Sequence, residues 1–138
     1  MGIGGVRMQD RFRFRAWDKE EKKMFYNAEM TYDYSLVADA CEADSFGTVL
    51  EDGNMIVMQC TGLKDKNGKL IYEGDILDGT YENLYVHYCD NCKQFQLKAK
   101  DYGCMACEGD IYWDELVESE DENELEVIGN IYENPELL

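Results

Sequence analysis

Closely spaced turn residues divide the apolar part of this chain into short segments, and this division most restricts what the chain can fold into. Residues 11–17 (RFRFRAW) alternate basic and apolar side chains with a period of two, which is typical of a half-buried strand. After a charged turn at residues 18–23, residues 23–26 (KMFY) can return as the neighbouring strand. We therefore expect a β-hairpin near the N-terminus.

Further short strands are expected along the rest of the chain. Residues 46–50 and 55–61 predict a second hairpin, because Asp52 and Gly53 between them suit the left-handed backbone of a tight turn. The other expected strands are residues 69–77, 81–88, 94–98 and 125–132, and the expected helical segments are residues 35–43 and 113–118. Strands at this spacing predict a mainly β, α+β protein with a small barrel or sandwich.

The composition is that of a globular protein. Hydrophobic residues make up 45% of the 138 residues, which is too large a share for a disordered chain. No apolar run approaches the roughly 20 residues that span a bilayer, and the N-terminus shows no apolar stretch followed by a cleavage site. We expect a soluble, cytoplasmic protein without a membrane contact.

The charge is strongly negative and unevenly distributed. The formal net charge is −17, residues 1–23 carry seven basic and four acidic side chains, and residues 108–138 carry twelve acidic and no basic ones. Such a field repels phosphates and anionic membranes. The plainer interpretation is a solvated acidic face, and the sharper one is a surface offered to a basic partner protein. Nucleic-acid binding would have to use the N-terminal arginines, Arg7, Arg11, Arg13 and Arg15.

Six cysteines are the sharpest chemical feature of the sequence. Four of them form two Cys-x-x-Cys pairs, Cys89 with Cys92 and Cys104 with Cys107, with eleven residues between the pairs. Two intervening residues allow one tight turn to direct both sulfurs at a metal, and two such turns complete a tetrahedral site for Zn²⁺. The eleven-residue spacing is shorter than the roughly 15 to 20 residues usual for this pattern.

Three interpretations of the paired cysteines stand side by side. A structural zinc ion is favoured over unligated thiols, and both are favoured over a redox pair or a disulfide, because a cytosolic chain seldom keeps disulfides. No βαβ pattern of the thioredoxin type surrounds either pair. Cys41 and Cys60 lack a partner spacing, and we expect them to be small core residues.

No pattern of catalytic residues stands out. His87 is the only histidine, so any histidine-based triad would have to include it, and it could alternatively serve as a metal ligand beside Cys89. The chain has no glycine-rich phosphate loop followed by lysine and no serine in a nucleophile-elbow context. We therefore predict that the protein is not an enzyme.

Three segments together resemble the YopX family of phage and prophage proteins. They are residues 13–18 (RFRAWD, followed by Lys23 and Met24), residues 61–77 (TGLKDKNGKLIYEGDIL) and residues 125–137 (LEVIGNIYENPEL), in the order typical of that family. The resemblance implies a mainly β protein whose C-terminal part is an SH3-like barrel or roll. It supplies no catalytic residues, and the paired cysteines lie outside its three segments.

These observations combine into one expectation for organisation and function. We expect an N-terminal β-rich segment with one short helix at residues 1–61 and an SH3-like barrel, carrying the zinc site, at residues 62–138. We expect a phage or prophage accessory protein in the bacterial cytoplasm that acts by non-catalytic protein–protein contact. Exposed strand edges favour self-association as well. The alternative is a zinc-containing nucleic-acid-binding module that uses the N-terminal arginines.

Overall fold

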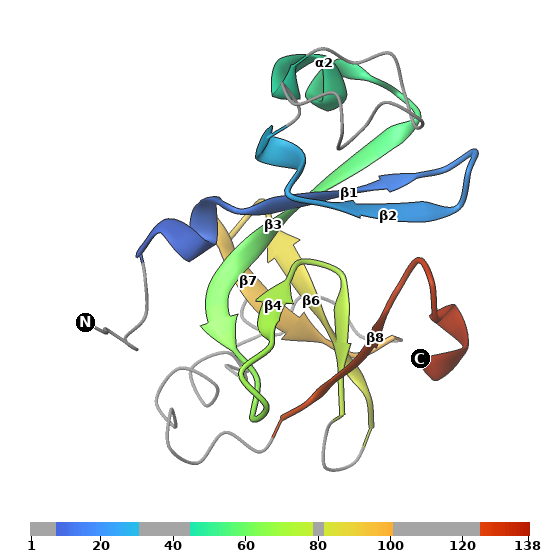
Figure 1. Ribbon diagram of the computed structural model, residues 1–138. Coiled ribbons are helices and arrows are strands. Elements are labelled where there is room, and N and C mark those ends of the chain that lie inside the picture. Colours follow the sequence, from blue (N-terminus) through green and yellow to red (C-terminus); the bar gives the residue numbers. More distant parts are fainter. Residues whose placement is uncertain (1–7, 31–44, 79–81, 101–124) are drawn as a thin grey trace. The chain divides into compact units, whose positions relative to one another are not determined.

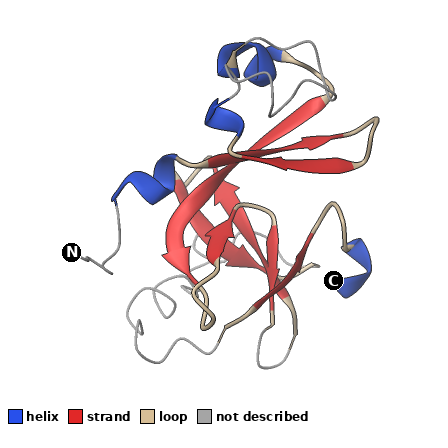
Figure 2. Ribbon diagram, in the orientation of Figure 1, coloured by secondary structure: helices blue, strands red, loops and turns tan. Residues whose placement is uncertain are grey.

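The structure, a computed structural model, describes residues 8–30, 45–78, 82–100 and 125–138, and these residues are mainly β (Figures 1 and 2). The strands are β1 (Phe14–Asp18), β2 (Lys23–Tyr26), β3 (Met55–Lys64), β4 (Leu70–Tyr72), β5 (Asp75–Leu77), β6 (Leu84–Cys89), β7 (Gln94–Lys98) and β8 (Val127–Asn130). The helical segments are the α-helix α2 (Phe46–Glu51) and the 3-10 helices η1 (Met8–Phe12), η2 (Ala28–Met30) and η3 (Pro135–Leu137). The predicted mainly β class is confirmed.

The described strands form two antiparallel sheets, with the orders β2-β1-β3-β4 and β7-β6-β5-β8. The chain divides into two compact units, Met1–Gly62 and Leu63–Leu138, and β3 passes from the first into the second. The sheet β7-β6-β5-β8 forms a half-barrel in the second unit. Among the helices of the described residues, none combines the length and hydrophobicity needed to cross a membrane.

In the first unit, β1 is an inner strand of the sheet β2-β1-β3-β4. It pairs antiparallel with β2 and with β3, so that Ala16 lies opposite Phe25 on one side and Val57 on the other. The face of the sheet that carries Ala16 is covered by α2 and η2. The centroids of the Phe14 and Phe46 rings lie 5.0 Å apart. The buried core residues are Ala16, Ala28, Val49 and Met55. The sequence correctly predicted β1, β2 and their antiparallel pairing.

The predicted strand at residues 46–50 is wrong, because these residues form α2. Ser45 has an extended backbone and its hydroxyl accepts a hydrogen bond from the Thr48 N–H (3.2 Å), which is the geometry of a helix N-cap. Phe46 and Val49 are three residues apart and so face the same core. The helices expected at residues 35–43 and 113–118 lie outside the described residues.

A buried carboxylate organises the turn between β1 and β2. One oxygen of Asp18 accepts hydrogen bonds from the Glu20 N–H (2.9 Å), the Glu21 N–H (2.8 Å) and the Asn54 side-chain amide (2.8 Å). Burial opposes ionisation of Asp18, but these donors and the charge of Lys23 outweigh it and lower its pKa. Asp18 therefore links the turn to the residue that precedes β3.

The second unit has its own core. Val86 of β6 lies opposite Leu97 of β7, and Ile76 of β5 lies opposite Tyr85 of β6 and Gly129 of β8. The buried apolar residues of this core are Ile71, Leu77, Val86, Leu97 and Val127. The strand expected at residues 69–77 is interrupted by a turn at Glu73 and Gly74 that separates β4 from β5.

A second buried carboxylate, Asp65, joins two distant parts of this unit. One oxygen accepts from the N–H groups of Asn67 and Lys69 (both 2.9 Å), and the other accepts from the Val127 N–H (3.0 Å). Burial alone would raise the pKa of Asp65, but the three donors and the charge of Lys69 hold the pKa below its ordinary value of 3.8. The β3–β4 turn is thereby held against the start of β8.

Two glycines are required where the backbone of this unit is closely packed. Gly74 has a φ of 89°, donates its N–H to the Val86 carbonyl (2.8 Å) and accepts at its own carbonyl from the Ile131 N–H (2.9 Å). A Cβ at Gly129 would lie 2.6 Å from the side-chain oxygen of Asn134, which accepts from the Asn130 N–H (3.3 Å). Both positions therefore exclude a side chain.

We predict that Asp65→Asn lowers the free energy of unfolding by about 1–3 kcal/mol, because the new amide must point at a backbone N–H and leave a buried donor unpaired. Urea denaturation at pH 7 measures this loss. Glu126→Gln is the matched control, because Glu126 is half-exposed beside Lys66 and such a pair contributes at most about 1 kcal/mol.

The stability difference between wild type and Asp65→Asn also depends on pH. The pKa of Asp65 is lowered in the folded protein, so its contribution is complete above pH 3.8 and is lost as the pH falls through the folded-state pKa. The difference should therefore shrink on acidification below pH 3.8. A difference that grows on acidification would contradict this account of Asp65.

We predict that Gly129→Ala destabilises the protein by about 1–3 kcal/mol, since the new methyl group would overlap the Asn134 side chain. Gly53→Ala is the control, because a Cβ there would meet no atom within 4 Å. Thermal unfolding of both variants measures the effect. Equal melting temperatures would show that Asn134 moves aside without cost.

Candidate functional site

The first predicted cysteine pair lies at the turn of the β6–β7 hairpin. Cys89 is the last residue of β6 and lies opposite Gln94, the first residue of β7. Cys92 lies in the four-residue turn, residues 90–93, that joins the two strands. Cys89 is buried at 4% exposure and Cys92 is half-buried. One tight turn therefore brings this pair together.

The turn has a defined hydrogen-bond pattern around the Cys89 sulfur. The Cys92 N–H donates to Cys89 Sγ (3.4 Å), and the Lys93 N–H donates to the Cys89 carbonyl (2.7 Å). Lys93 adopts the left-handed backbone conformation with a φ of 55°. This conformation directs the chain back into β7 within four residues of Cys89.

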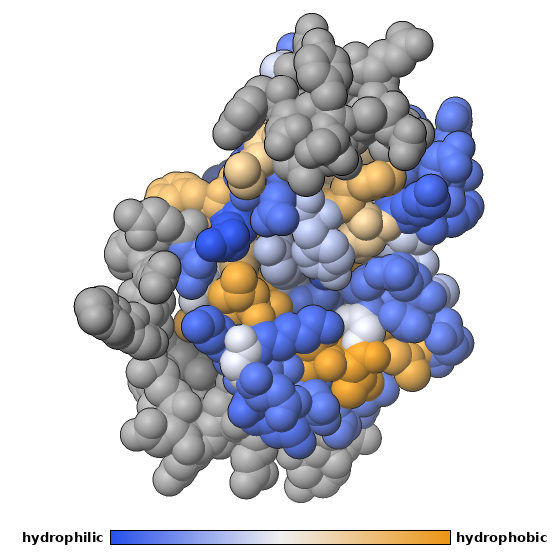
Figure 3. Space-filling view, viewed as in Figure 1, coloured by the Kyte–Doolittle hydropathy of each residue, from blue (hydrophilic) through white to orange (hydrophobic). Residues whose placement is uncertain are grey.

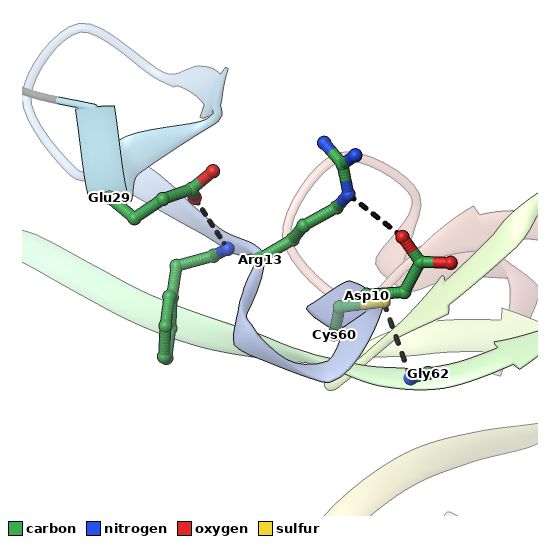
Figure 4. A network of polar contacts seen from close by, with 6 residues as sticks. Asp10, Arg13, Glu29, Cys60 and Gly62 are labelled. Carbon is green, nitrogen blue, oxygen red and sulfur yellow. Dashed lines mark hydrogen bonds and ion pairs between the residues drawn. The ribbon is translucent and has the colours of Figure 1, made fainter. Parts of the chain in front are cut away.

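The second predicted pair, Cys104 and Cys107, lies outside the described residues, as does Cys41. Within the described ranges, no cluster of three or more His, Cys, Asp or Glu side chains has an arrangement that could hold a metal ion. The four-cysteine zinc site is thus still a prediction, of which the structure describes one half. Cys60 lies in the first unit, is buried, and its sulfur accepts from the Gly62 N–H (3.4 Å) (Figure 4).

His87 lies two residues before Cys89 on β6, so strand alternation places both residues on the same face of the hairpin. His87 pairs across the strands with Gln96. Burial and the positive charge of Lys98 lower its pKa, and Asp90 opposes the shift only in part. His87 is therefore neutral at pH 7, which is the protonation state that can ligate a metal.

The described N-terminal arginines do not form one continuous basic strip. Arg13 Nε contacts an Asp10 carboxylate oxygen at 3.1 Å (Figure 4). Arg15 is buried at 2% exposure, and its guanidinium donates to the Tyr26 hydroxyl (3.5 Å). Arg11 is exposed and lies over the Phe12 ring, 4.9 Å from its centroid. Arg7 lies outside the described residues.

The structure corrects the expected strand at residues 11–17, because η1 ends at Phe12 and β1 begins at Phe14. Next to this junction, the Phe14 N–H donates to the Glu29 carboxylate (2.8 Å) (Figure 4). The period-two pattern would place the arginines on a solvent face, but Arg15 is buried beneath Tyr26. The alternation of basic and apolar residues in the sequence does not indicate that Arg15 is buried.

Two large aromatic side chains of the described first unit are exposed at its surface. The structure leaves Phe12 54% exposed and Tyr26 46% exposed on the first unit. On the face shown in Figure 3, apolar areas lie between larger hydrophilic ones. The exposed large apolar residues of the described chain are Phe12, Tyr26, Met30 and Leu50.

Three polar side chains in the two later sequence motifs are buried and hydrogen-bonded inside the fold. Asp65, Asp75 and Asn130 are all buried. Asp75 accepts from the Tyr72 N–H (2.8 Å), and the Asn130 side-chain oxygen accepts from the Tyr132 and Glu133 N–H groups (3.1 and 2.9 Å). These motifs therefore define turns and strand contacts.

Comparison with known proteins relates this fold to one family and to solved structures. The chain is similar to protein EF1440 from Enterococcus faecalis, with 30% sequence identity and a TM-score of 0.54. The match covers 91% of this chain and 96% of the other. None of the curated proteins matches the chain.

The family model for the YopX protein matches residues 13–138, nearly the whole sequence. This range includes β1, the Asp65 turn, Gly74 and Asp75, and β8 with the turn that follows it. The resemblance seen in the three sequence motifs is thus confirmed, and the chain belongs to the YopX family.

Proposed function

We propose that this chain is a non-catalytic interaction module of a phage or prophage, acting in the bacterial cytoplasm on a basic partner protein. The main support is that three polar side chains of its motifs, Asp65, Asp75 and Asn130, are buried against the chain's own backbone. A catalytic acid or base must reach its substrate. These groups maintain the fold, so we expect the exposed residues to make the contacts with a partner.

Two carboxyl groups of the described chain whose pKa values are lowered support the same interpretation. Asp18 and Asp65 have lowered pKa values, and backbone N–H donors oppose the burial that would otherwise raise them. They therefore stay ionised at pH 7 and cannot act as acids there, whereas a general acid at neutral pH needs a raised pKa. The YopX family is, in addition, not a known enzyme family.

The charge distribution favours a basic partner. The first unit has seven basic and eleven acidic residues, a net of −4, and the second has six basic and nineteen acidic residues, a net of −13. A charge of this size attracts a positively charged protein over distances up to the Debye length, about 10 Å at 0.1 M salt. It also repels nucleic-acid phosphates.

The contacts of the arginines give less support to nucleic-acid binding, which we keep as the second proposal. Arg15 is buried with its guanidinium on Tyr26 and offers no open cation to a phosphate, whereas Arg13 is exposed but its charge is partly neutralised by the contact of its Nε with Asp10. Arg11, exposed over Phe12, is the described arginine best placed for such a contact. Two exposed arginines among the described residues, one of them ion-paired, give little phosphate affinity within a chain of charge −17.

We predict that the binding partner is basic and that its affinity falls as salt rises. Cross-linking in the host identifies the partner, and titration of the purified pair at about 50, 150 and 300 mM salt measures the Kd. Replacing three exposed acidic residues of the second unit (Asp78→Asn, Glu82→Gln, Glu136→Gln) should raise the Kd roughly three- to ten-fold at low salt.

The matched control removes the same charge from the first unit, by Glu20→Gln, Glu21→Gln and Glu51→Gln, and should change the Kd less. An affinity independent of salt would contradict an electrostatic partner. Retardation of DNA or RNA by the purified chain at low salt, abolished by Arg11→Ala, would instead establish the nucleic-acid alternative.

A further inference from the structure

We propose that Asn67 is a site of spontaneous deamidation and that this modification loosens the hold of the β3–β4 turn on β8. Asn67 and Gly68 form the only Asn-Gly pair of the sequence. Both residues lie in the turn that Asp65 organises. The reaction needs no partner protein, so it is independent of the proposed interaction function.

The reaction uses the backbone of the residue that follows the asparagine. The Gly68 nitrogen, once deprotonated, attacks the side-chain carbonyl carbon of Asn67 and ammonia leaves, which gives a five-membered succinimide ring. Water then opens the ring at either carbonyl, and the products are aspartate and isoaspartate. Water is consumed and ammonia is released, with no change of oxidation state. Glycine at the second position favours the attack because it has no Cβ to obstruct it.

The accessibility of the turn suits this reaction. Asn67 and Gly68 are both exposed, and a Cβ built on Gly68 would meet no atom within 4 Å. The flanking Lys66 and Lys69 are exposed as well. Water and hydroxide can therefore reach the peptide bond between Asn67 and Gly68.

Two hydrogen bonds must break before the reacting atoms can meet. The Gly68 N–H donates to the Asp65 carbonyl (3.0 Å), which is the bond that closes a four-residue β-turn. The Asn67 side-chain amide donates to one carboxylate oxygen of Glu126 (3.1 Å). Local opening of the turn releases both groups, so the rate of deamidation in the folded protein follows how often the turn opens.

Deamidation changes the contact between the turn and Glu126, the residue before β8. The Glu126 carboxylate accepts from the Asn67 amide and lies 3.5 Å from the Lys66 ammonium. A carboxylate at position 67 has no N–H to donate, and its charge repels that of Glu126. The modification therefore replaces an attractive contact by a repulsive one.

The isoaspartate product also alters the backbone, because it inserts one carbon atom into the main chain between the Asn67 α-carbon and Gly68. In the unmodified turn the N–H groups of Asn67 and Lys69 both donate to the same oxygen of Asp65 at 2.9 Å. The longer main chain changes the spacing of these two donors, so the buried Asp65 carboxylate loses part of its bonding. Its other oxygen, which accepts from the Val127 N–H, is then held less firmly against β8.

The test begins with incubation of the full-length wild-type protein in mildly alkaline buffer, followed by peptide mapping with mass spectrometry. We expect the peptide that contains Asn67 to convert into aspartate and isoaspartate forms. The peptide that contains Asn91, an exposed turn residue followed by Cys92, should stay unchanged. The converted protein gains negative charge and can be separated by anion exchange, and its Tm should lie at least about 2 °C below that of the unmodified protein.

Variants then separate the chemical step from the opening of the turn. Gly68→Ala should slow the conversion at least about ten-fold, because the new Cβ obstructs the attack. Gly53→Ala is the matched control and should leave the rate unchanged. Asp65→Asn should raise the rate at least about two-fold, because the turn opens more often. In urea, where wild type and Gly68→Ala are both unfolded, the difference between them should persist.

Three results would overturn the proposal. The first is folded wild-type protein that keeps its amide at Asn67 while the urea-unfolded chain converts. The second is an equal rate of conversion for wild type and Gly68→Ala in urea. The third is a deamidated protein with the Tm of the unmodified one, which would show that Asn67 does not help to hold the turn against β8.

Discussion

The Asp65 carboxylate is the interaction on which the second unit most depends. β8 lies 62 residues after Asp65 in the chain, and the hydrogen bond from the Val127 N–H fixes where this strand begins. Burying a charge is costly unless its oxygens are bonded, and here three backbone donors meet the two oxygens. The carboxylate therefore closes a long loop and defines a turn at the same time.

Asp18 has the corresponding role in the first unit. It combines a local turn, through the Glu20 and Glu21 N–H groups, with a distant contact to Asn54 before β3. In each unit a buried carboxylate thus joins a local turn to a distant part of the chain by hydrogen bonds. Other acidic residues of the described chain, such as Glu20 and Glu82, are exposed to solvent, and a chain of net charge −17 still builds two cores.

The sequence pattern predicted elements whose signals are local and missed those that depend on distant residues. β2 and β7 have the predicted bounds, because each is a short run between polar turns. Residues 46–50 were predicted as a strand because a short apolar run fits either period, and the Ser45 cap decides for a helix. The role of Asp65 depends on Val127, which no local pattern contains.

The candidate site follows the same division between local and distant information. The Cys-x-x-Cys spacing of Cys89 and Cys92 is local, and it correctly predicted a turn that brings the pair together. The basic N-terminal strip was also a local prediction, but the burial of Arg15 and the ion pair of Arg13 depend on Tyr26 and Asp10 and divide the strip.

The division between framework and surface bears on how this fold can carry a function. Asp65, Asp75 and Asn130 are committed to backbone geometry, so changing them alters folding before it alters binding. By contrast, the tip of the β6–β7 hairpin is exposed on one side, and its conformation is set by four residues of backbone. This turn can therefore vary at its exposed residues without using any group that the two cores require.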